Sequence, residues 1–270
     1  MEKRVKKQVN NYKKEFRMRV LCFGDTHESL DLRTSIEENS PDHDMVLCVG
    51  DFVDREKEDY YMPEPTYAVF RNHDAVSPKQ GAPQSFRTAE ELIERSDNIT
   101  HVEDGRVHKE QGLRLAGFNG NYSPRNFDES KADSTKPRHS TKKAYRKCLD
   151  LRHGSRLDFF LSHEAPLGCA DLDWRTGEKH YGVDVVRELL EVLRPRFFLS
   201  GHIHSQQVGF CKGTWAINVG YGVNREFVIV DLSRERIELY EEGHRKLETI
   251  SFSKAENALP KQKDLRFPPF

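Results

Sequence analysis

Short apolar runs, each followed by a polar residue of a metal-binding type, constrain this chain most. Five runs of five or six residues are typical of buried strands, and each is followed within a few residues by Asp, Asn or His. These runs cover residues 19–23, 45–49, 66–70, 157–162 and 196–200. Several of these runs are separated by stretches whose apolar residues recur with the period of an α-helix, including one over 183–193. The pattern predicts an α/β fold in which the sheet is covered on both faces.

In such folds ligands collect at the carboxyl ends of the strands, so the residues after each run are candidate site residues. One Asp, Asn or His after a strand is most often a turn residue. Five such strand ends together indicate a binding site instead. Seven ligand-type side chains exceed what one ion takes from a protein, which predicts a pair of divalent ions of intermediate hardness. The seven are Asp25, His27, Asp51, Asn72, His163, His202 and His204.

Composition excludes some classes of protein. The chain of 270 residues has 10% aromatic residues, which is too many for a disordered chain, and no apolar stretch approaches the length of a membrane span. The N-terminal lysines and arginines precede no apolar segment, so we expect no signal peptide and a cytoplasmic protein. Cys22 and Cys48 lie in apolar runs, as buried free thiols in a reducing compartment do.

The net charge of −1 gives no global reason to expect nucleic acid, but two segments are locally basic. We expect a basic extension over 1–17, one domain over 18–250 with an insertion at about 119–156, and a tail over 251–270. We expect the basic part of the insertion, 131–156, to be solvated surface. The alternative is that it binds an anionic partner.

The ordered motifs identify a family resemblance. The chain reads GDTH at 24–27, GDFVDR at 50–55, RNHD at 71–74, SHEAP at 162–166 and GHIH at 201–204. This series resembles the motif set of the calcineurin-like metallophosphoesterase superfamily. The resemblance implies two mixed β-sheets packed as a sandwich, flanked by helices, with a dinuclear metal site at the loop end. Manganese is the first expectation for the ions, with iron, zinc, nickel or magnesium as alternatives.

The resemblance also implies roles for individual residues. Asp25, His27 and His204 would hold the first ion, and Asp51 would bridge both. The second ion would be held by Asn72, His163 and His202. His73 would donate a proton or hydrogen bond to the substrate while Asp54 orients its imidazole, and a metal-activated hydroxide would attack phosphorus.

Two departures from the family pattern affect the substrate assignment. The usual glycine of the third motif is Arg71, which is either strained or faces phosphate. Prolines in 60–65 leave no room for a long helix between the second and third motifs. The substrate candidates are Arg71, Arg55 and Asn119.

Three functions compete. The first is a phosphodiesterase acting on a nucleotide or another small phosphodiester. The second is a nuclease acting on RNA or DNA, because the layout weakly resembles the lariat-debranching branch of the superfamily. There Lys142, Lys143, Arg146 and Lys147 would bind the backbone and Tyr145 would stack on bases, unless Tyr145 is a core residue. The third is a non-catalytic scaffold of the same fold, and retention of the full ligand set counts against it. The sequence does not indicate an oligomeric state.

Overall fold

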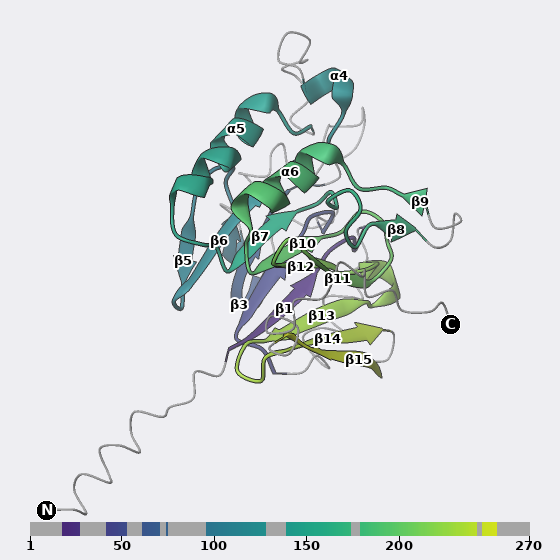
Figure 1. Ribbon diagram of the computed structural model, residues 1–270. Helices are drawn as coiled ribbons and strands as arrows, with labels where there is room; N and C mark the ends of the chain where they lie inside the picture. The colour runs from purple at the N-terminus through teal and green to yellow at the C-terminus, as the bar shows by residue number, and fades with distance from the viewer. Residues whose placement is uncertain are drawn as a thin grey trace, which may run out of the picture.

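The computed structural model describes residues 18–27, 42–52, 61–70, 74, 96–127, 139–173, 179–241 and 245–252. Within these ranges two large mixed sheets form the body of the protein (Figure 1). This arrangement confirms the predicted sandwich of two mixed sheets. The sequence pattern favours helices over 28–38 and 86–95, but both ranges lie outside the described residues. The basic extension 1–17 and most of the C-terminal tail also lie outside them, so the domain boundaries stay a prediction.

The first sheet has seven strands. Its parallel half, β1 to β4, is built from strands in chain order, and β13 to β15 add to it as antiparallel strands beside β1. In spatial order they are β15 (Arg245–Ser251), β14 (Arg236–Glu241), β13 (Phe227–Asp231), β1 (Arg19–Phe23), β2 (Met45–Cys48), β3 (Tyr61–Ala68) and β4 (Asp97–His101).

The third strand is longer than the sequence predicted, because β3 begins at Tyr61 rather than at residue 66. Its pairing with β4 is irregular between Tyr61 and Thr66. Pro63 and Pro65 lie in this irregular stretch, where a proline need not donate a hydrogen bond to the sheet. The described part of the segment between the second and third motifs is thus strand, in agreement with the expectation that it holds no long helix.

The second sheet has six strands, of which β6, β7, β10 and β12 are parallel, with β5 and β11 antiparallel at the edges. In spatial order they are β11 (Gln207–Cys211), β12 (Thr214–Asn218), β10 (Phe197–Ser200), β7 (Phe159–Ser162), β6 (Leu113–Phe118) and β5 (His108–Glu110). A short pair, β8 (Leu172–Asp173) and β9 (Lys179–His180), stands apart from it.

The sequence pattern over 205–241 favours consecutive antiparallel strands, and this is right for β11–β12 and for β13–β14. The chain changes sheets between these two hairpins, since β12 belongs to the second sheet and β13 to the first. Residues 219–226 make the crossing. Gln206 joins the two sheets at this crossing, because its side-chain amide nitrogen, Nε2, donates to the carbonyl oxygens of Val219, Phe227 and Tyr240.

Alternate residues of the central strands belong to different hydrophobic clusters. In β1, Val20 and Cys22 pack between the sheets, whereas Leu21 and Phe23 pack on the outer face of the first sheet. Met45 and Leu47 of β2 likewise face the interior of the sandwich. Both faces of these strands are buried, which explains why they read as continuous apolar runs rather than as alternating ones.

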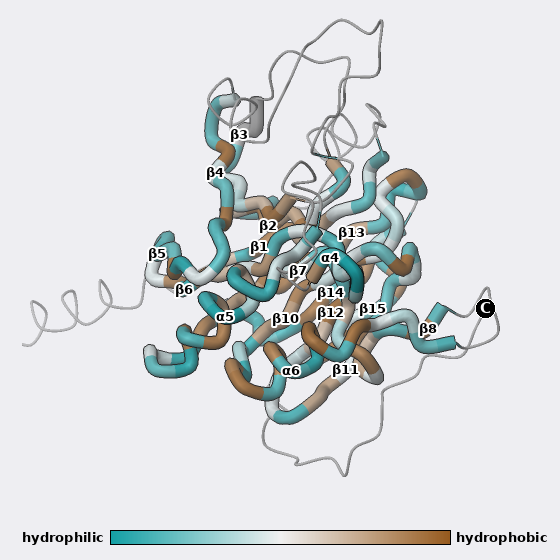
Figure 2. Tube along the Cα trace, turned by 90° about the horizontal axis from the view of Figure 1, so that it is seen from above, coloured by the Kyte–Doolittle hydropathy of each residue, from teal (hydrophilic) through white to brown (hydrophobic). Residues whose placement is uncertain are grey.

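Two helices cover the outer face of the second sheet (Figure 1). Helix α6 (Asp184–Leu193) buries Val186, Leu189, Leu190 and Leu193, as its predicted helical face requires. Helix α5 (Lys142–Asp150) begins at Thr141, whose hydroxyl caps the helix by accepting a hydrogen bond from the backbone N–H of Ala144. Both helices carry polar and apolar segments, while the apolar strands gather in the centre (Figure 2).

Helix α5 and the short α4 (Pro124–Phe127) belong to the predicted insertion. The ring of Tyr145 packs edge-on against Phe118 and Phe127, so the core interpretation of Tyr145 fits the structure better than base stacking. Among the helices of the described residues, none is long and apolar enough to cross a bilayer.

The cysteines divide into two kinds. Cys22, Cys48 and Cys148 are buried free thiols, as the sequence predicted for the first two. Burial raises the pKa of Cys22 and of Cys148, so both stay protonated and unreactive at neutral pH. Cys169 and Cys211 form a disulfide, which the sequence did not predict because the two residues are 42 positions apart.

The disulfide gives a simple prediction. Unfolded protein that was never reduced should show three titratable thiols, and the same protein after reduction should show five. A thiol titration in denaturant, with and without prior reduction, measures both numbers. A count of five without reduction would show that Cys169 and Cys211 stay reduced in the source compartment.

Candidate metal centre

The predicted strand ends meet at one end of the sandwich. The residues after β1 and β2 come from the first sheet, and those after β7 and β10 come from the second. Backbone hydrogen bonds connect these loops directly, from Asp25 N to Gly50 O and from Gly201 N to His163 O. Six of the seven predicted ligands lie in the described residues, and five of them form two compact groups.

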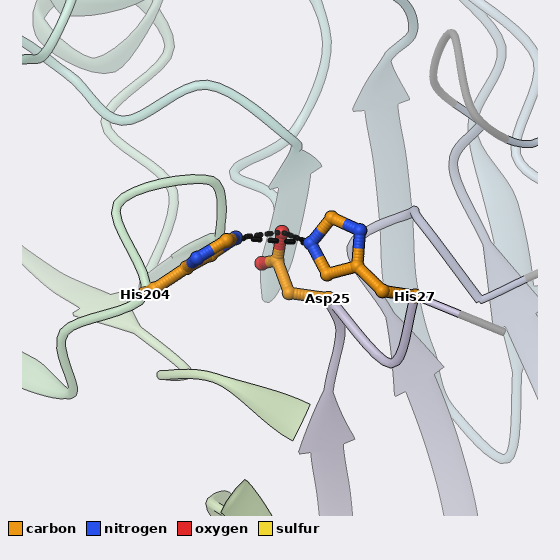
Figure 3. A group of neighbouring side chains, drawn as sticks. All are labelled: Asp25, His27 and His204. Carbon is orange, nitrogen blue, oxygen red and sulfur yellow. Dashed lines mark hydrogen bonds and ion pairs between the residues drawn. The ribbon is translucent and has the colours of Figure 1, made fainter. Parts of the chain in front are cut away.

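The first group contains Asp25, His27 and His204, whose side chains converge (Figure 3). The Nε2 atoms of the two imidazoles lie 3.1 Å apart, and His204 Nε2 lies 3.2 Å from Asp25 Oδ1. Two atoms bound to one ion at about 2.1 Å stand about 3.0–3.4 Å apart in octahedral or tetrahedral geometry. The His27 Nε2 to Asp25 Oδ1 distance is longer, at 3.8 Å. Two of the three separations therefore suit a common ion.

The second group contains Asp25, Asp51 and His163, and all three side chains are buried. His163 Nε2 lies 3.8 Å from both Asp25 Oδ1 and Asp51 Oδ2. Its other ring nitrogen, Nδ1, lies 2.8 Å from the carbonyl oxygen of Val49 and donates to it, since a carbonyl oxygen only accepts. This hydrogen bond fixes the ring with Nε2 toward the carboxylates, as in metal-binding histidines.

His202 stands beside these groups rather than within them. Its ring centroid is 5.2 Å from that of His163, and its backbone N–H donates to Asp25 Oδ2 at 2.8 Å. Its Nε2 lies 3.7 Å from the carboxylate of Glu164, which is buried. Glu164 was not singled out from the sequence, although it directly follows a predicted ligand.

The backbone at these residues is unusual. Asp25, His27, Asp51, His202 and His204 all have φ between 45° and 68°, in the left-handed region. Asp and His tolerate this region better than most residues, but it still costs about 1–3 kcal/mol at each position. The glycines that precede the ligands in the motifs have two different roles. Gly50 takes a sharp turn, whereas Gly201 is needed because a Cβ there would collide with the carboxylate of Asp25.

Asp74 holds the loop of Asp51 in place. Its two carboxylate oxygens accept the backbone N–H groups of Asp51 and Phe52, at 2.8 and 2.9 Å. Asp74 is the last residue of the third motif and is only 2% exposed. The motif therefore ties the third strand end to the second, a role that was not assigned from the sequence.

The charge state of the site suits a cation. Burial alone would raise the pKa of Asp25, but the charge of His163 and hydrogen bonds from His204 and from the backbone of His202 lower it, to about 2. Asp25 is therefore an ionised carboxylate at neutral pH, which is the form that binds metal ions.

The sequence profile of the Calcineurin-like phosphoesterase family matches residues 18–206. The chain belongs to this family. A search of curated proteins found no match. The match spans all the strand ends described above, so the family's motifs and the convergent side chains coincide.

Solved structures show the same fold at low identity. Protein TT1561 of Thermus thermophilus is 13% identical with a TM-score of 0.55, covering 83% of this chain and 99% of its own. GAP50, titled the anchor in the inner membrane complex of Plasmodium, is 12% identical with a TM-score of 0.51, covering 87% and 88%. Purple acid phosphatase PPD1 from yellow lupin is 13% identical with a TM-score of 0.51, covering 87% of this chain and 53% of its own. At these identities the likeness concerns the fold alone.

Calcineurin-like phosphoesterases use divalent metal ions, and the donor set here fits them. Imidazole nitrogens and carboxylate oxygens suit manganese, iron or zinc. The two groups share Asp25, so the positions that two ions would take lie next to each other.

Several predicted residues lie outside the described residues, namely Asp54, Arg55, Arg71, Asn72 and His73. Asn119, a substrate candidate, is described. Its Oδ1 accepts from the backbone N–H of Phe70 and lies 3.0 Å from His101 Nε2, while its Nδ2 donates to Val102 O and Asp104 Oδ1. The amide thus holds the end of β3 just before the third motif, and a substrate contact would have to replace one of these bonds.

Proposed function

We propose that this protein is a dinuclear, metal-dependent phosphodiesterase that hydrolyses a nucleotide or another small phosphodiester. One observation carries the proposal: in a calcineurin-like phosphoesterase chain, two groups of potential ligands share a buried, ionised Asp25. Family membership supports hydrolysis of phosphoric esters in general, and the preference for diesters is our proposal.

In this proposal Asp25, His27 and His204 would hold one ion, and His163, His202 and Asn72 would hold the other. Asp51, which lies in the second ligand group of the structure, would bridge the two ions, as the family resemblance implies. When bound, such a pair of ions supplies an activated water and stabilises charge on the phosphoryl oxygens. Manganese is the ion that we propose. Glu164, whose carboxylate lies 3.7 Å from Nε2 of His202, would orient that imidazole through its negative charge.

The remaining roles belong to the second and third motifs. His73 would hold a hydrogen bond or donate a proton to the leaving oxygen, and Asp54 would orient its imidazole. Arg71 and Arg55 would contact the phosphate oxygens, where a guanidinium binds in a bidentate manner. The residues on either side of 71–73 are both held in place, because Phe70 is hydrogen-bonded to Asn119 and Asp74 to the loop of Asp51.

The decisive experiment compares a diester with a monoester. Protein supplemented with manganese is assayed on bis-p-nitrophenyl phosphate and on p-nitrophenyl phosphate, then on cyclic nucleotides and labelled RNA. Faster turnover of the diester supports the proposal, and faster turnover of the monoester contradicts it. Metal-loaded protein that turns over none of these substrates would favour the scaffold alternative.

A nuclease is the second candidate, and one observation favours it. Lys142, Lys143 and Arg146 lie exposed on α5, and none has an acidic residue within ion-pair distance in the described structure. The helix begins beside Asn121, whose carbonyl accepts the backbone N–H of Ser140, and Asn121 follows β6 at the ligand end of the second sheet. The cations thus start near the candidate centre. Tyr145 offers no stacking surface there, because its ring is packed inside.

This candidate makes a quantitative prediction. If the three cations contact a single strand, neutralising them as Lys142→Gln, Lys143→Gln and Arg146→Gln should weaken RNA binding. The log–log salt slope should then fall by about 0.7 per lost contact. Fluorescence anisotropy at several salt concentrations measures the slope. A matched triple variant at exposed Lys109, Lys179 and Lys212 controls for net charge. Equal slopes in the two variants would remove α5 from any nucleic-acid role.

The compartment stays a proposal. Three buried free thiols fit the cytoplasm that the sequence predicted, whereas a Cys169–Cys211 disulfide is more common in oxidising compartments. The thiol titration described above, on protein from its own cells, decides between them.

A further inference from the structure

The crossing between the two sheets places an aromatic residue at the candidate metal centre. Residues 219–226 leave β12 and enter β13. Within them, the backbone N–H of Gly222 donates to Gly24 O, directly before Asp25, at 3.2 Å. The N–H of Tyr221 donates to the carboxylate of Glu226 at 2.8 Å. The fold therefore fixes the backbone on either side of the Tyr221 ring.

The ring of Tyr221 lies against two of the candidate ligands. It stacks on His204, with centroids 4.1 Å apart and planes 17° from parallel, and meets the edge of His27 at 5.7 Å. The side chains of His204 and His27 are 23% and 26% exposed, whereas Asp25 is fully buried. The partly exposed members of the first group are therefore its two imidazoles, and these are the rings that Tyr221 contacts.

The hydroxyl of Tyr221 is uncommitted. Three other tyrosines bond to glutamate: Tyr67 to Glu110 at 2.7 Å, Tyr240 to Glu238 at 3.3 Å, and Tyr145 to Glu188. The Tyr221 hydroxyl forms no hydrogen bond in the described structure. Val223 on the same turn is 39% exposed. An aromatic ring with a spare hydroxyl thus lies beside the first ligand group, and an exposed apolar side chain follows two residues later.

We propose that Tyr221 contacts the substrate by packing against an aromatic group esterified to phosphorus, while its hydroxyl donates to an ester oxygen. Tyr221 is then a specificity-determining residue that favours aryl or nucleoside esters over alkyl esters. The inference rests on the proposed function, since it assigns part of the substrate to the same site. The competing explanation is that the ring only supports His204, in which case its removal affects metal binding.

The test uses the full chain loaded with manganese and three variants. Tyr221→Leu removes the ring and the hydroxyl, Tyr221→Phe removes the hydroxyl alone, and Tyr181→Leu is a control at an exposed tyrosine. Bis-p-nitrophenyl phosphate and ethyl p-nitrophenyl phosphate release the same leaving group but differ in the second substituent. Metal content is measured by mass spectrometry, and calorimetry measures the affinity for diphenyl phosphate.

We expect Tyr221→Leu to raise KM for the diaryl ester by about 2- to 10-fold more than for the ethyl ester, the range for one aromatic contact, because loss of the hydroxyl affects both esters. Tyr221→Phe should fall between wild type and Tyr221→Leu, and Tyr181→Leu should match wild type. Metal content should not change. Loss of manganese, equal effects on both esters, or no effect would each overturn the proposal.

Failure of the proposed function gives a different result. If wild-type protein hydrolyses neither ester, the phosphodiesterase proposal fails, and the affinity for diphenyl phosphate then decides on Tyr221 alone. If Tyr221→Leu binds diphenyl phosphate more weakly than Tyr181→Leu does, the proposed contact of Tyr221 with the aromatic group stands. Equal affinities, or no detectable binding, would refute that contact.

Discussion

Asp51→Asn is expected to lose both metal ions together and to lower turnover of an aryl phosphodiester by more than about 10³-fold, because the ions supply several kcal/mol of transition-state stabilisation. The variant removes one negative charge from a side chain that is 1% exposed and keeps its volume. Asp51 faces His163 at 3.8 Å, and its backbone is held by Asp74 independently of its own carboxylate. The loop should therefore stay in place when the charge is removed.

The measurement is metal stoichiometry by mass spectrometry after dialysis, followed by kinetics. Asp97→Asn, at an exposed residue that begins β4, is the matched control. Asp25→Asn is the informative comparison, because Asp25 belongs to both ligand groups in the structure. If Asp51→Asn retains one tightly bound ion while Asp25→Asn retains none, the shared ligand is Asp25 and the bridging role implied by the family resemblance is wrong.

His73→Ala is expected to keep both ions and to lower turnover by about 10²–10⁴-fold, the range for a general acid or base. The reason is that His73 acts on the leaving oxygen in our proposal and is not a ligand. The flanking residues Phe70 and Asp74 are held by their own hydrogen bonds, so the truncation should leave the ends of the motif in place.

The comparison of metal content with turnover distinguishes the two roles of a histidine. His153→Ala, at an exposed histidine, serves as the control. His73→Ala should lower the turnover of an ester with a very good leaving group less than that of an ester with a poor one, since a very good leaving group departs without a proton. A proportionate loss of metal and turnover would instead make His73 a ligand.

The sandwich was predictable in part because burial leaves a direct trace in the sequence. Strands β1 and β2 read as continuous apolar runs because clusters cover both of their faces. Helix α6 was predictable from one buried stripe. The change of sheet after Asn218 was not, since an antiparallel hairpin has the same local pattern whichever sheet it joins. The Cys169–Cys211 pair was missed for a similar reason, because pairing depends on tertiary distance.

The site shows the same division. Asp25, His27, Asp51, His163 and His204 were found because they follow strands whose carboxyl ends meet in space. Asp74, Glu164 and Tyr221 were not assigned roles, because each acts on a residue far along the chain: on Asp51, His202 and His204, respectively. No spacing in the sequence encodes such contacts. The signal available for Tyr221 was only that it lies between two glycines, at 220 and 222.

The left-handed backbone at five of the candidate ligands has a consequence for protein engineering. At such positions glycine or asparagine would relieve backbone strain, so searches for greater heat resistance will favour exchanges there. Each of those exchanges would remove the carboxylate or imidazole of a candidate ligand. Substitutions that raise thermostability in these loops should therefore lower activity, whereas substitutions in the sheets can raise stability without this loss.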